Sequence, residues 1–311
     1  MTDKPANTNA NRGYLAALVS TLFLATTAIF IRYLALNFKL PALVLTFWRE
    51  LFVACFLLLF FLLFKPTLLK GARPHLPYLA AYGLVLALFN GSWTLSVALN
   101  GASVATVLVY SSAAFTAVLG WLILKEKLGL AKIIAVILSL AGCALVANAL
   151  DPKLWALNAS GVLVGVLAGL AYAVYSLMGR SASQRGLNPW TTLFFIFGIA
   201  SIFLLVANLG FGRLLPGGAA RPADLFWLGN SLSGWSVLLT LAAIPTLLGF
   251  GLYNVSLKHL PSSVANLIMT SEPVFTAIIA FFMFGEMLSP IQIAGSAIIL
   301  VGVALIRLTG K

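Results

Sequence analysis

Long apolar runs constrain this sequence more than any other feature. Twenty residues of α-helix rise about 30 Å, which is the thickness of the hydrocarbon core of a bilayer. The runs show no alternation of period two, so strands are excluded and helices are expected. The chain is therefore predicted to be an all-α integral membrane protein with ten transmembrane helices. The runs are 13–36, 41–64, 76–98, 102–124, 131–150, 158–179, 190–209, 234–257, 261–284 and 290–308.

The composition supports a membrane protein and excludes a soluble one. Of the 311 residues, 61% are hydrophobic and 8% are charged, whereas soluble domains carry about 25% charged residues. The net charge of +12 would suggest a nucleic acid partner for a soluble chain. In a membrane chain, basic residues flank the spans and set the topology. We therefore expect a lipid bilayer around the protein, no nucleic acid partner and no obligate protein partner.

Basic residues indicate which side of the membrane holds the termini. With a cytoplasmic N-terminus, thirteen of the 19 lysines and arginines fall in cytoplasmic segments, five fall on the far side, and Arg49 lies within the second run. Positively charged loops stay in the cytoplasm, so both termini are predicted to be cytoplasmic. Residues 1–12 lack a cleavage pattern and are expected to form a disordered tail ahead of an uncleaved first span.

An internal repeat organises the ten runs. When the chain is shifted by 160 residues, S-V-A at 103–105 matches S-V-A at 263–265, and F-T-A at 115–117 matches F-T-A at 275–277. Each repeat holds five spans, and five is odd, so the second repeat enters the membrane from the opposite side. Inverted repeats are typical of transporters that bind substrate in a central cavity between the repeats. The predicted units are a tail, a first repeat and an inverted second repeat, at 1–12, 13–150 and 158–308.

Polar residues inside the spans are the candidates for substrate binding, because a membrane helix tolerates polar groups only where they contact protein or water. On the third run, Tyr82, Asn90 and Trp93 fall on one helical face. For the aromatic residues, helix packing and an interfacial aromatic belt remain alternatives. The candidates from all runs are Tyr82, Asn90, Trp93, Tyr110, Ser111, Tyr175, Tyr253, Asn254, Thr270 and Glu272.

Three charged residues and one proline inside the spans carry separate predictions. Glu272 is the only charge in the run 261–284, and an ionised acid in lipid costs at least ~2.5 kcal/mol, so it should face protein or water. It is either a structural ion-pair residue or a site that titrates during transport, and Arg49 is one hypothetical partner. Arg49 and Glu50 are neighbours that point to different sides of a helix, so no direct contact is expected between them. Pro245 predicts a kink, either a gating hinge or a static bend.

The motifs of enzymes are missing from the sequence. There is no H-E-x-x-H, G-x-S-x-G, P-loop or dinucleotide-binding glycine pattern, so neither enzyme activity nor a cofactor is expected. The histidines, His75 and His259, fall in predicted loops, and Cys55 and Cys143 are expected to be buried packing residues. These residues predict no metal site. A lipid-modifying intramembrane enzyme and a channel-like sensor remain the alternatives to a transporter.

Several short motifs resemble those of a known family. S-E-P-V-F-T-A at 271–277, F-G-E-M-L at 284–288, K-E-K-L at 125–128 and F-W-R at 47–49 resemble the EamA-domain branch of the drug/metabolite transporter superfamily, in particular its YddG-type exporters. The resemblance implies inverted repeats of five helices around a central cavity, in a cell inner membrane. It also implies export of small metabolites, such as aromatic and other neutral amino acids, by alternating access. The carrier would be either a facilitator or proton-coupled.

Overall fold

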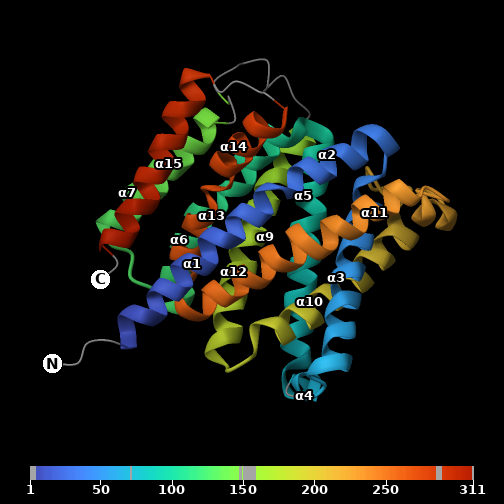
Figure 1. Ribbon diagram of the computed structural model, residues 1–311, viewed down its shortest axis with the longest axis horizontal. Coiled ribbons are helices and arrows are strands. Elements are labelled where there is room, and N and C mark those ends of the chain that lie inside the picture. The colour runs from blue at the N-terminus through green and yellow to red at the C-terminus, as the bar shows by residue number, and fades with distance from the viewer. Residues whose placement is uncertain (1–4, 71, 147–148, 150–158, 285–288, 310–311) are drawn as a thin grey trace.

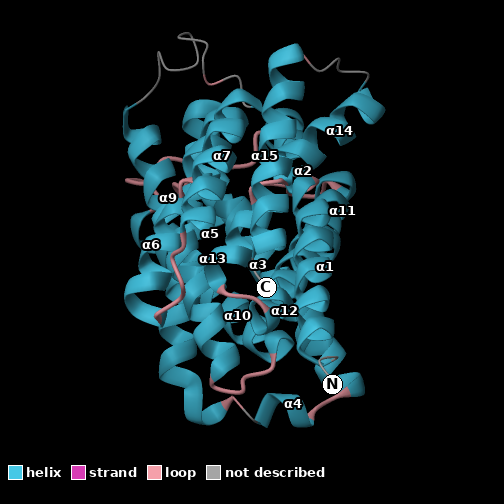
Figure 2. Cartoon of the chain, turned by 90° about the vertical axis from the view of Figure 1, so that its left-hand side faces the viewer, coloured by secondary structure: helices cyan, strands magenta, loops and turns pink. Residues whose placement is uncertain are grey.

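The computed structural model describes residues 5–70, 72–146, 149, 159–284 and 289–309. These residues form helices joined by short turns, with no strand among them (Figures 1 and 2), so the predicted all-α fold is confirmed for this part of the chain. The elements in chain order are α1 (Pro5–Ala25), α2 (Thr27–Phe38), α3 (Ala42–Phe64), α4 (Thr67–Lys70), η1 (Arg73–His75), α5 (Leu76–Tyr110), α6 (Ser112–Leu124), α7 (Leu130–Val146), α9 (Ala159–Gln184), α10 (Pro189–Phe211), η2 (Pro222–Phe226), α11 (Leu232–Leu241), η3 (Ala242–Thr246), α12 (Leu247–His259), α13 (Ser262–Met269), α14 (Glu272–Phe284) and α15 (Pro290–Thr309).

Eight segments of the described chain are long and apolar enough to cross a membrane. Of the other two predicted runs, 131–150 contains the shorter apolar helix α7, and 261–284 is divided between α13 and α14. The chain is therefore a multi-pass membrane protein, while ten spans and the inversion of the halves stay predictions. The eight segments are Ala10–Phe38, Ala42–Phe64, Thr67–Leu99, Ala105–Leu124, Ala159–Gln184, Pro189–Phe211, Leu232–His259 and Pro290–Leu308.

The first helix begins earlier than the sequence indicated. It starts at Pro5, inside the segment 1–12 that we expected to be a disordered tail, and continues into the first apolar run. Proline suits the first position of a helix, because the N–H that it lacks has no partner there in any case. Helix therefore replaces the expected disordered tail at residues 5–12, while residues 1–4 lie outside the described part.

Large apolar side chains are exposed on the surface, and the interior contains polar groups among its apolar residues. On α3, Leu59 and Phe64 are more than half exposed, whereas Asn266 of α13 is fully buried. This pattern suits a bundle surrounded by lipid. Cys55 also lies exposed on α3, so the expectation that it is buried is wrong, while Cys143 is buried as predicted.

Four of the predicted runs are interrupted, and each interruption carries a serine or threonine hydroxyl. In lipid, a carbonyl group freed at a helix end has no water to bond with, so the protein must supply its partner. Each hydroxyl donates to a carbonyl oxygen of the same segment, and at Thr26, Ser111 and Ser271 it does so in addition to a backbone N–H. The donors and acceptors are Thr26 to Phe23 O at 2.7 Å, Ser111 to Leu108 O at 2.6 Å, Thr246 to Leu241 O at 2.8 Å, and Ser271 to Ile268 O at 2.7 Å.

The interruptions at Ser111 and Ser271 have the same local geometry. In both, the serine N–H and the serine Oγ bond to the carbonyl oxygen three residues earlier. In both, the serine carbonyl also accepts the N–H of the third residue that follows, at 3.1 Å for Ser111 and 3.0 Å for Ser271. The two serines are one repeat length apart in the sequence. At this point the sequence repeat is accompanied by a repeated backbone structure.

Pro245 interrupts the eighth run, as predicted. It lies inside the π-turn η3 between α11 and α12. Proline has no N–H and cannot continue the hydrogen-bond ladder of an α-helix, so a wider turn is formed around it.

Helix α5 turns back on itself between Ser96 and Leu108. A Cβ atom placed on Gly165 of α9 would lie 2.7 Å from Ser96 Oγ and 2.6 Å from Leu108 Cδ1. Ser96 and Leu108 are twelve residues apart, and in a straight helix their backbones would be separated by about 18 Å. The reversal agrees with the predicted boundary between the runs 76–98 and 102–124, and it places both parts of α5 against α9.

Helices α7 and α15 pack side by side at one edge of the molecule (Figure 1). Glycines permit their close approach. A Cβ atom on Gly142 would lie 2.6 Å from Ile299 Cγ1 and 2.7 Å from the carbonyl oxygen of Gly295. Small residues at such contacts are important in membranes, where helix association depends on close packing rather than on the hydrophobic effect.

We predict that Gly142→Ala lowers the free energy of unfolding by about 1–3 kcal/mol, because the added methyl group overlaps the backbone of α15. The matched control is Gly210→Ala on α10, where a Cβ atom meets nothing within 4 Å. Alanine there should be neutral or stabilising, since it favours a helix by about 1 kcal/mol over glycine. Thermal unfolding of the purified chain in detergent measures both. An unchanged unfolding temperature for Gly142→Ala would contradict the tight contact.

Candidate functional site

A pocket lies among α1, α2, α3, α5, α9, α12 and α14, beside the helix interruptions. Its volume is about 50 Å³. Its wall combines charged and amide groups with aromatic rings, as sites for small molecules do. The lining residues are Leu24, Thr27, Arg49, Phe89, Asn90, Trp93, Thr106, Val109, Tyr110, Tyr172, Phe250 and Glu272.

The ten candidate residues from the sequence fall into three groups. Two of them, Ser111 and Thr270, lie at helix interruptions, where their hydroxyls bond to the carbonyl oxygens of Leu108 and Leu267. Four line the pocket, namely Asn90, Trp93, Tyr110 and Glu272. The remaining four belong to a buried polar layer next to the pocket, namely Tyr82, Tyr175, Tyr253 and Asn254.

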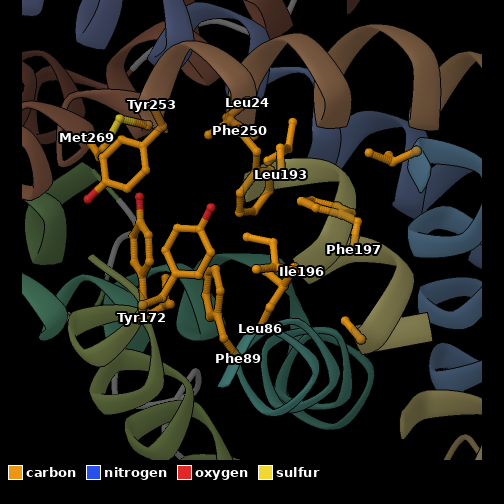
Figure 3. Packing of buried hydrophobic residues seen from close by; sticks show 14 of the residues in the cluster. Leu24, Leu86, Phe89, Tyr172, Leu193, Ile196, Phe197, Phe250, Tyr253 and Met269 are labelled. Atoms are coloured by element: carbon orange, nitrogen blue, oxygen red, sulfur yellow. The ribbon is translucent and has the colours of Figure 1, made fainter. Parts of the chain in front are cut away.

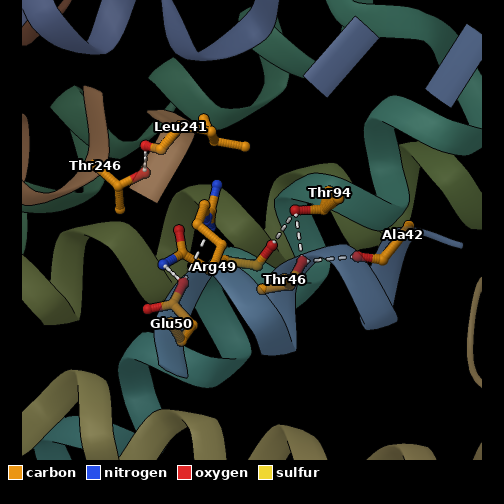
Figure 4. Close-up of polar contacts among 8 residues, drawn as sticks. Ala42, Thr46, Arg49, Glu50, Thr94, Leu241 and Thr246 are labelled. Atoms are coloured by element: carbon orange, nitrogen blue, oxygen red, sulfur yellow. Dashed lines mark hydrogen bonds and ion pairs between the residues drawn. The ribbon is translucent and has the colours of Figure 1, made fainter. Parts of the chain in front are cut away.

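Arg49 and Glu50 contact each other beside the pocket (Figure 4), so the expectation that these neighbours stay apart is wrong. Arg49 Nη2 donates to Glu50 Oε1 at 3.1 Å, and Asn90 Nδ2 donates to the same oxygen at 2.6 Å. Both charged side chains are at most 1% exposed. Facing lipid would cost more than bending a long arginine side chain back along its own helix, so the two charges meet in the interior. The partner of Arg49 is therefore Glu50 and not Glu272, which was the hypothetical partner.

This buried pair is incompletely hydrogen-bonded. Arg49 Nε and Glu50 Oε2 are buried and have no hydrogen-bond partner in the described structure. A buried ion pair needs further hydrogen bonds to offset the loss of hydration, so this one contributes little to stability. Removing one partner would nevertheless be costly, because the other would remain as an unpaired buried charge.

Threonines fix α3 against α5 beside the pair. Thr46 Oγ1 donates to Thr94 Oγ1 at 3.0 Å, and Thr94 Oγ1 donates to the carbonyl oxygen of Asn90 at 2.7 Å (Figure 4). All three residues are buried. The contacts hold the Asn90 backbone, and with it the amide that bonds to Glu50, in a fixed place at the pocket.

Glu272 faces the pocket from the first turn of α14. Its Oε2 accepts a hydrogen bond from the Tyr110 hydroxyl at 2.7 Å. It takes part in none of the ion pairs found among the described residues. The position at a helix N-terminus favours a negative charge. The carboxylate thus faces the pocket, as predicted from its place in an apolar run.

Helix α13, which precedes Glu272, is anchored at its start by Glu126. The Glu126 carboxylate accepts the backbone N–H of Ser262 at 2.7 Å and of Ser263 at 3.2 Å, and it also accepts both serine hydroxyls. Lys132 Nζ donates to Ser263 Oγ at 2.8 Å. A carboxylate at this place satisfies free N–H groups and interacts favourably with the helix dipole. The anchor fixes α13 relative to the end of α6.

A buried polar layer lies between the pocket and the end of the bundle where α12 ends and α13 begins. We call it the tyrosine layer, and its members are Tyr82, Tyr175, Ser176, Tyr253, Asn254 and Asn266. All are at most 4% exposed. Their hydrogen bonds connect four helices, α5, α9, α12 and α13. These bonds are Asn254 Nδ2 to Tyr175 OH at 2.6 Å, Tyr82 OH to Asn254 Oδ1 at 3.3 Å, Ser176 Oγ with Tyr253 OH at 2.7 Å, and Asn266 Nδ2 to Ser176 Oγ at 3.2 Å.

Aromatic rings connect the tyrosine layer to the pocket wall. The rings of Phe89 and Tyr172 stack with centroids 4.5 Å apart and planes 4° from parallel. Tyr253 lies one helical turn beyond Phe250, with its ring centroid 5.7 Å from that of Tyr172 (Figure 3). The layer therefore follows directly on the pocket on this side.

The pocket presents charged, hydrogen-bonding and aromatic groups, which suit noncovalent binding of a small polar molecule. Among the described residues, no group of three or more histidine, cysteine, aspartate or glutamate side chains is placed to hold a metal ion.

We predict that Glu50→Ala lowers the free energy of unfolding by about 3–5 kcal/mol, because the Arg49 guanidinium is then buried without its partner. The double variant Arg49→Met/Glu50→Leu removes both charges and keeps a similar volume, so its stability should equal or exceed that of the unaltered chain. Thermal unfolding of the two purified variants decides this. A double variant as unstable as Glu50→Ala would show that the pair itself stabilises the fold.

Known proteins resemble this chain along nearly its whole length. The sequence profile of the EamA-like transporter family matches residues 11–148 and 159–308. An uncharacterized transporter of Archaeoglobus fulgidus is 26% identical over 296 residues, which cover 94% of each chain. The threonine/homoserine exporter RhtA of Salmonella typhimurium is 27% identical over 234 residues, which cover 74% of this chain and 70% of the exporter.

One solved crystal structure superposes on the chain with a TM-score of 0.74 at 16% sequence identity, covering 96% of this chain and 98% of that one. The two proteins therefore share a fold. The sequence relatives are named as transporters and not as enzymes. Because the family profile matches both halves of the chain, the resemblance seen in the sequence motifs is confirmed. The chain belongs to the EamA-like transporter family and is a membrane transporter of small-molecule substrates.

Proposed function

We propose that the protein exports amino acids, both aromatic and other neutral ones, across the cell inner membrane by alternating access through the central pocket. The observation that carries this proposal is the pocket wall, where Arg49, Asn90 and Glu272 supply polar groups beside the stacked rings of Phe89 and Tyr172. Polar groups are costly inside a membrane, and in transporters they mark the path of the substrate.

The tyrosine layer supports alternating access. Its side-chain hydrogen bonds join four helices beside the pocket, and in the proposed mechanism they close the pocket toward this end. Such bonds can exchange partners while the helices stay intact, so the layer can open without unfolding any segment. In the proposed inverted arrangement of 13–150 and 158–308, rocking one repeat against the other would open this end and close the opposite one. The distribution of lysine and arginine supports a cytoplasmic location for this end and for both termini.

The substrate class is supported by a relative and by the pocket. RhtA of Salmonella typhimurium is named as an exporter of threonine and homoserine, which are small zwitterions. The hydroxyl and amide groups in the pocket wall can bond to such substrates, and its rings can stack on an aromatic side chain. Coupling is either to a proton at Glu272 or absent, as in a facilitator.

We predict a counterflow overshoot for the purified full-length chain in liposomes. Liposomes loaded with unlabelled phenylalanine or threonine should accumulate the labelled amino acid transiently, because a carrier exchanges one substrate molecule for another. A channel would equilibrate the label without an overshoot, and a lipid-modifying enzyme would give no uptake. Protein-free liposomes are the control, and an imposed proton gradient then separates a coupled carrier from a facilitator. No overshoot for any neutral amino acid would contradict the proposal.

A further inference from the structure

Two groups of opposite charge face the pocket from different helices, Arg49 from α3 and Glu272 from α14. They are not each other's partners, because Arg49 is paired with Glu50 and Glu272 accepts its hydrogen bond from Tyr110. The pocket wall therefore has a cationic part and an anionic part that a ligand can contact separately.

The cationic part has unused hydrogen-bonding capacity. A guanidinium carries five N–H donors in a planar fork that matches a carboxylate. Here one nitrogen, Nη2, is bonded to Glu50, and Nε is buried without a partner. Because Arg49 lines the pocket, a guanidinium with this unused capacity can donate to a carboxylate bound there.

The anionic part is also open to a further partner. The Glu272 carboxylate can accept about four hydrogen bonds, and the structure records one, from the Tyr110 hydroxyl. No lysine or arginine among the described residues lies within ion-pair distance of it. An ammonium group would compensate a carboxylate that is otherwise buried with a single neutral donor.

We propose that Arg49 and Glu272 are two poles that select α-amino acids as zwitterions, with the substrate carboxylate on Arg49 and the substrate ammonium on Glu272. The inference rests on the proposed transport function and adds the recognition rule of its site. Glu50 and Asn90 are positioning residues, since Glu50 bonds to the guanidinium and Asn90 donates to Glu50. The side chain of the substrate lies against the stacked rings of Phe89 and Tyr172.

The rule is tested with three ligands that share one aromatic side chain. Phenylalanine carries both charges, 2-phenylethylamine carries only the ammonium, and 3-phenylpropionate carries only the carboxylate. Binding to the purified full-length chain is measured from the ligand-induced rise in unfolding temperature, which needs no turnover. We expect phenylalanine to bind at least about tenfold more tightly than either analogue, because it alone contacts both poles.

Variants assign the poles. Glu272→Gln should weaken phenylalanine binding at least about tenfold and leave 3-phenylpropionate unchanged. Arg49→Met/Glu50→Leu removes the cationic pole without leaving a buried charge, so it should weaken phenylalanine binding and leave 2-phenylethylamine unchanged. Cys55→Ala, on the exposed side of α3, is the control and should bind all three ligands as the unaltered chain does.

Equal binding of the three ligands to the unaltered chain would overturn the proposal. So would a variant that weakens all three ligands by the same factor, because the removed group then does not discriminate among them. Counterflow of phenylalanine in the same preparation distinguishes a failure of the two-pole rule from a failure of the proposed transport function. Exchange without discrimination overturns the two poles alone, whereas the absence of exchange overturns the proposed function and this inference with it.

Discussion

Backbone groups freed inside a bilayer must find hydrogen-bond partners within the protein, and the rest of this structure depends on how that requirement is met. At each of the four helix interruptions a serine or threonine hydroxyl donates to a carbonyl oxygen, in three cases in addition to a backbone N–H. Residues next to three of these interruptions line the pocket, namely Thr27, Tyr110 and Glu272. The same breaks that interrupt the helices thus bring polar groups together in the interior, while the outer surface stays apolar. A pocket for a polar substrate is in this sense a consequence of where the helices are broken.

Charge inside the bundle follows a second constraint, because every buried ion must be compensated. Arg49 is compensated by Glu50, yet the pair leaves donors and acceptors unused and contributes little to stability. In the proposed function, its place beside the pocket serves ligand binding. Glu272 has only a neutral partner in the described structure. The tyrosine layer, in contrast, contains no charge, and each of its members is hydrogen-bonded, which agrees with its proposed role as a seal.

Much of the fold could be predicted from the sequence, and the reasons are physical. Apolar runs bounded by breakers have few alternatives to membrane helices, and Pro245 cannot continue a helix. The interruptions at Thr26 and Ser111 were not predictable, since neither has a proline or glycine beside it. Asn90 and Glu272 stood out because a polar group in an apolar run needs a partner or a cavity.

The rest of the site depends on how deep each residue lies along the membrane normal, and the periodicity of the sequence gives no information on this. Helical spacing predicts which face of its own helix each of Tyr82, Tyr175 and Tyr253 occupies. The level at which neighbouring helices meet places these residues in the layer rather than in the pocket. Apolar lining residues such as Phe89 and Phe250 carry no signal that separates them from ordinary packing residues. The Arg49–Glu50 contact was missed because the rule for neighbours on a helix describes exposed side chains, and here both charges avoid lipid.

The central claim is that one pocket is reached in turn from both faces of the membrane. Its most direct test is the reactivity of a cysteine at the lining residue Val109. In a chain with Cys55→Ala and Cys143→Ala, the account predicts that Val109→Cys reacts with a membrane-impermeant maleimide added from either face, and that bound phenylalanine slows both reactions. Reaction from one face only, under all conditions of substrate exchange, would contradict it.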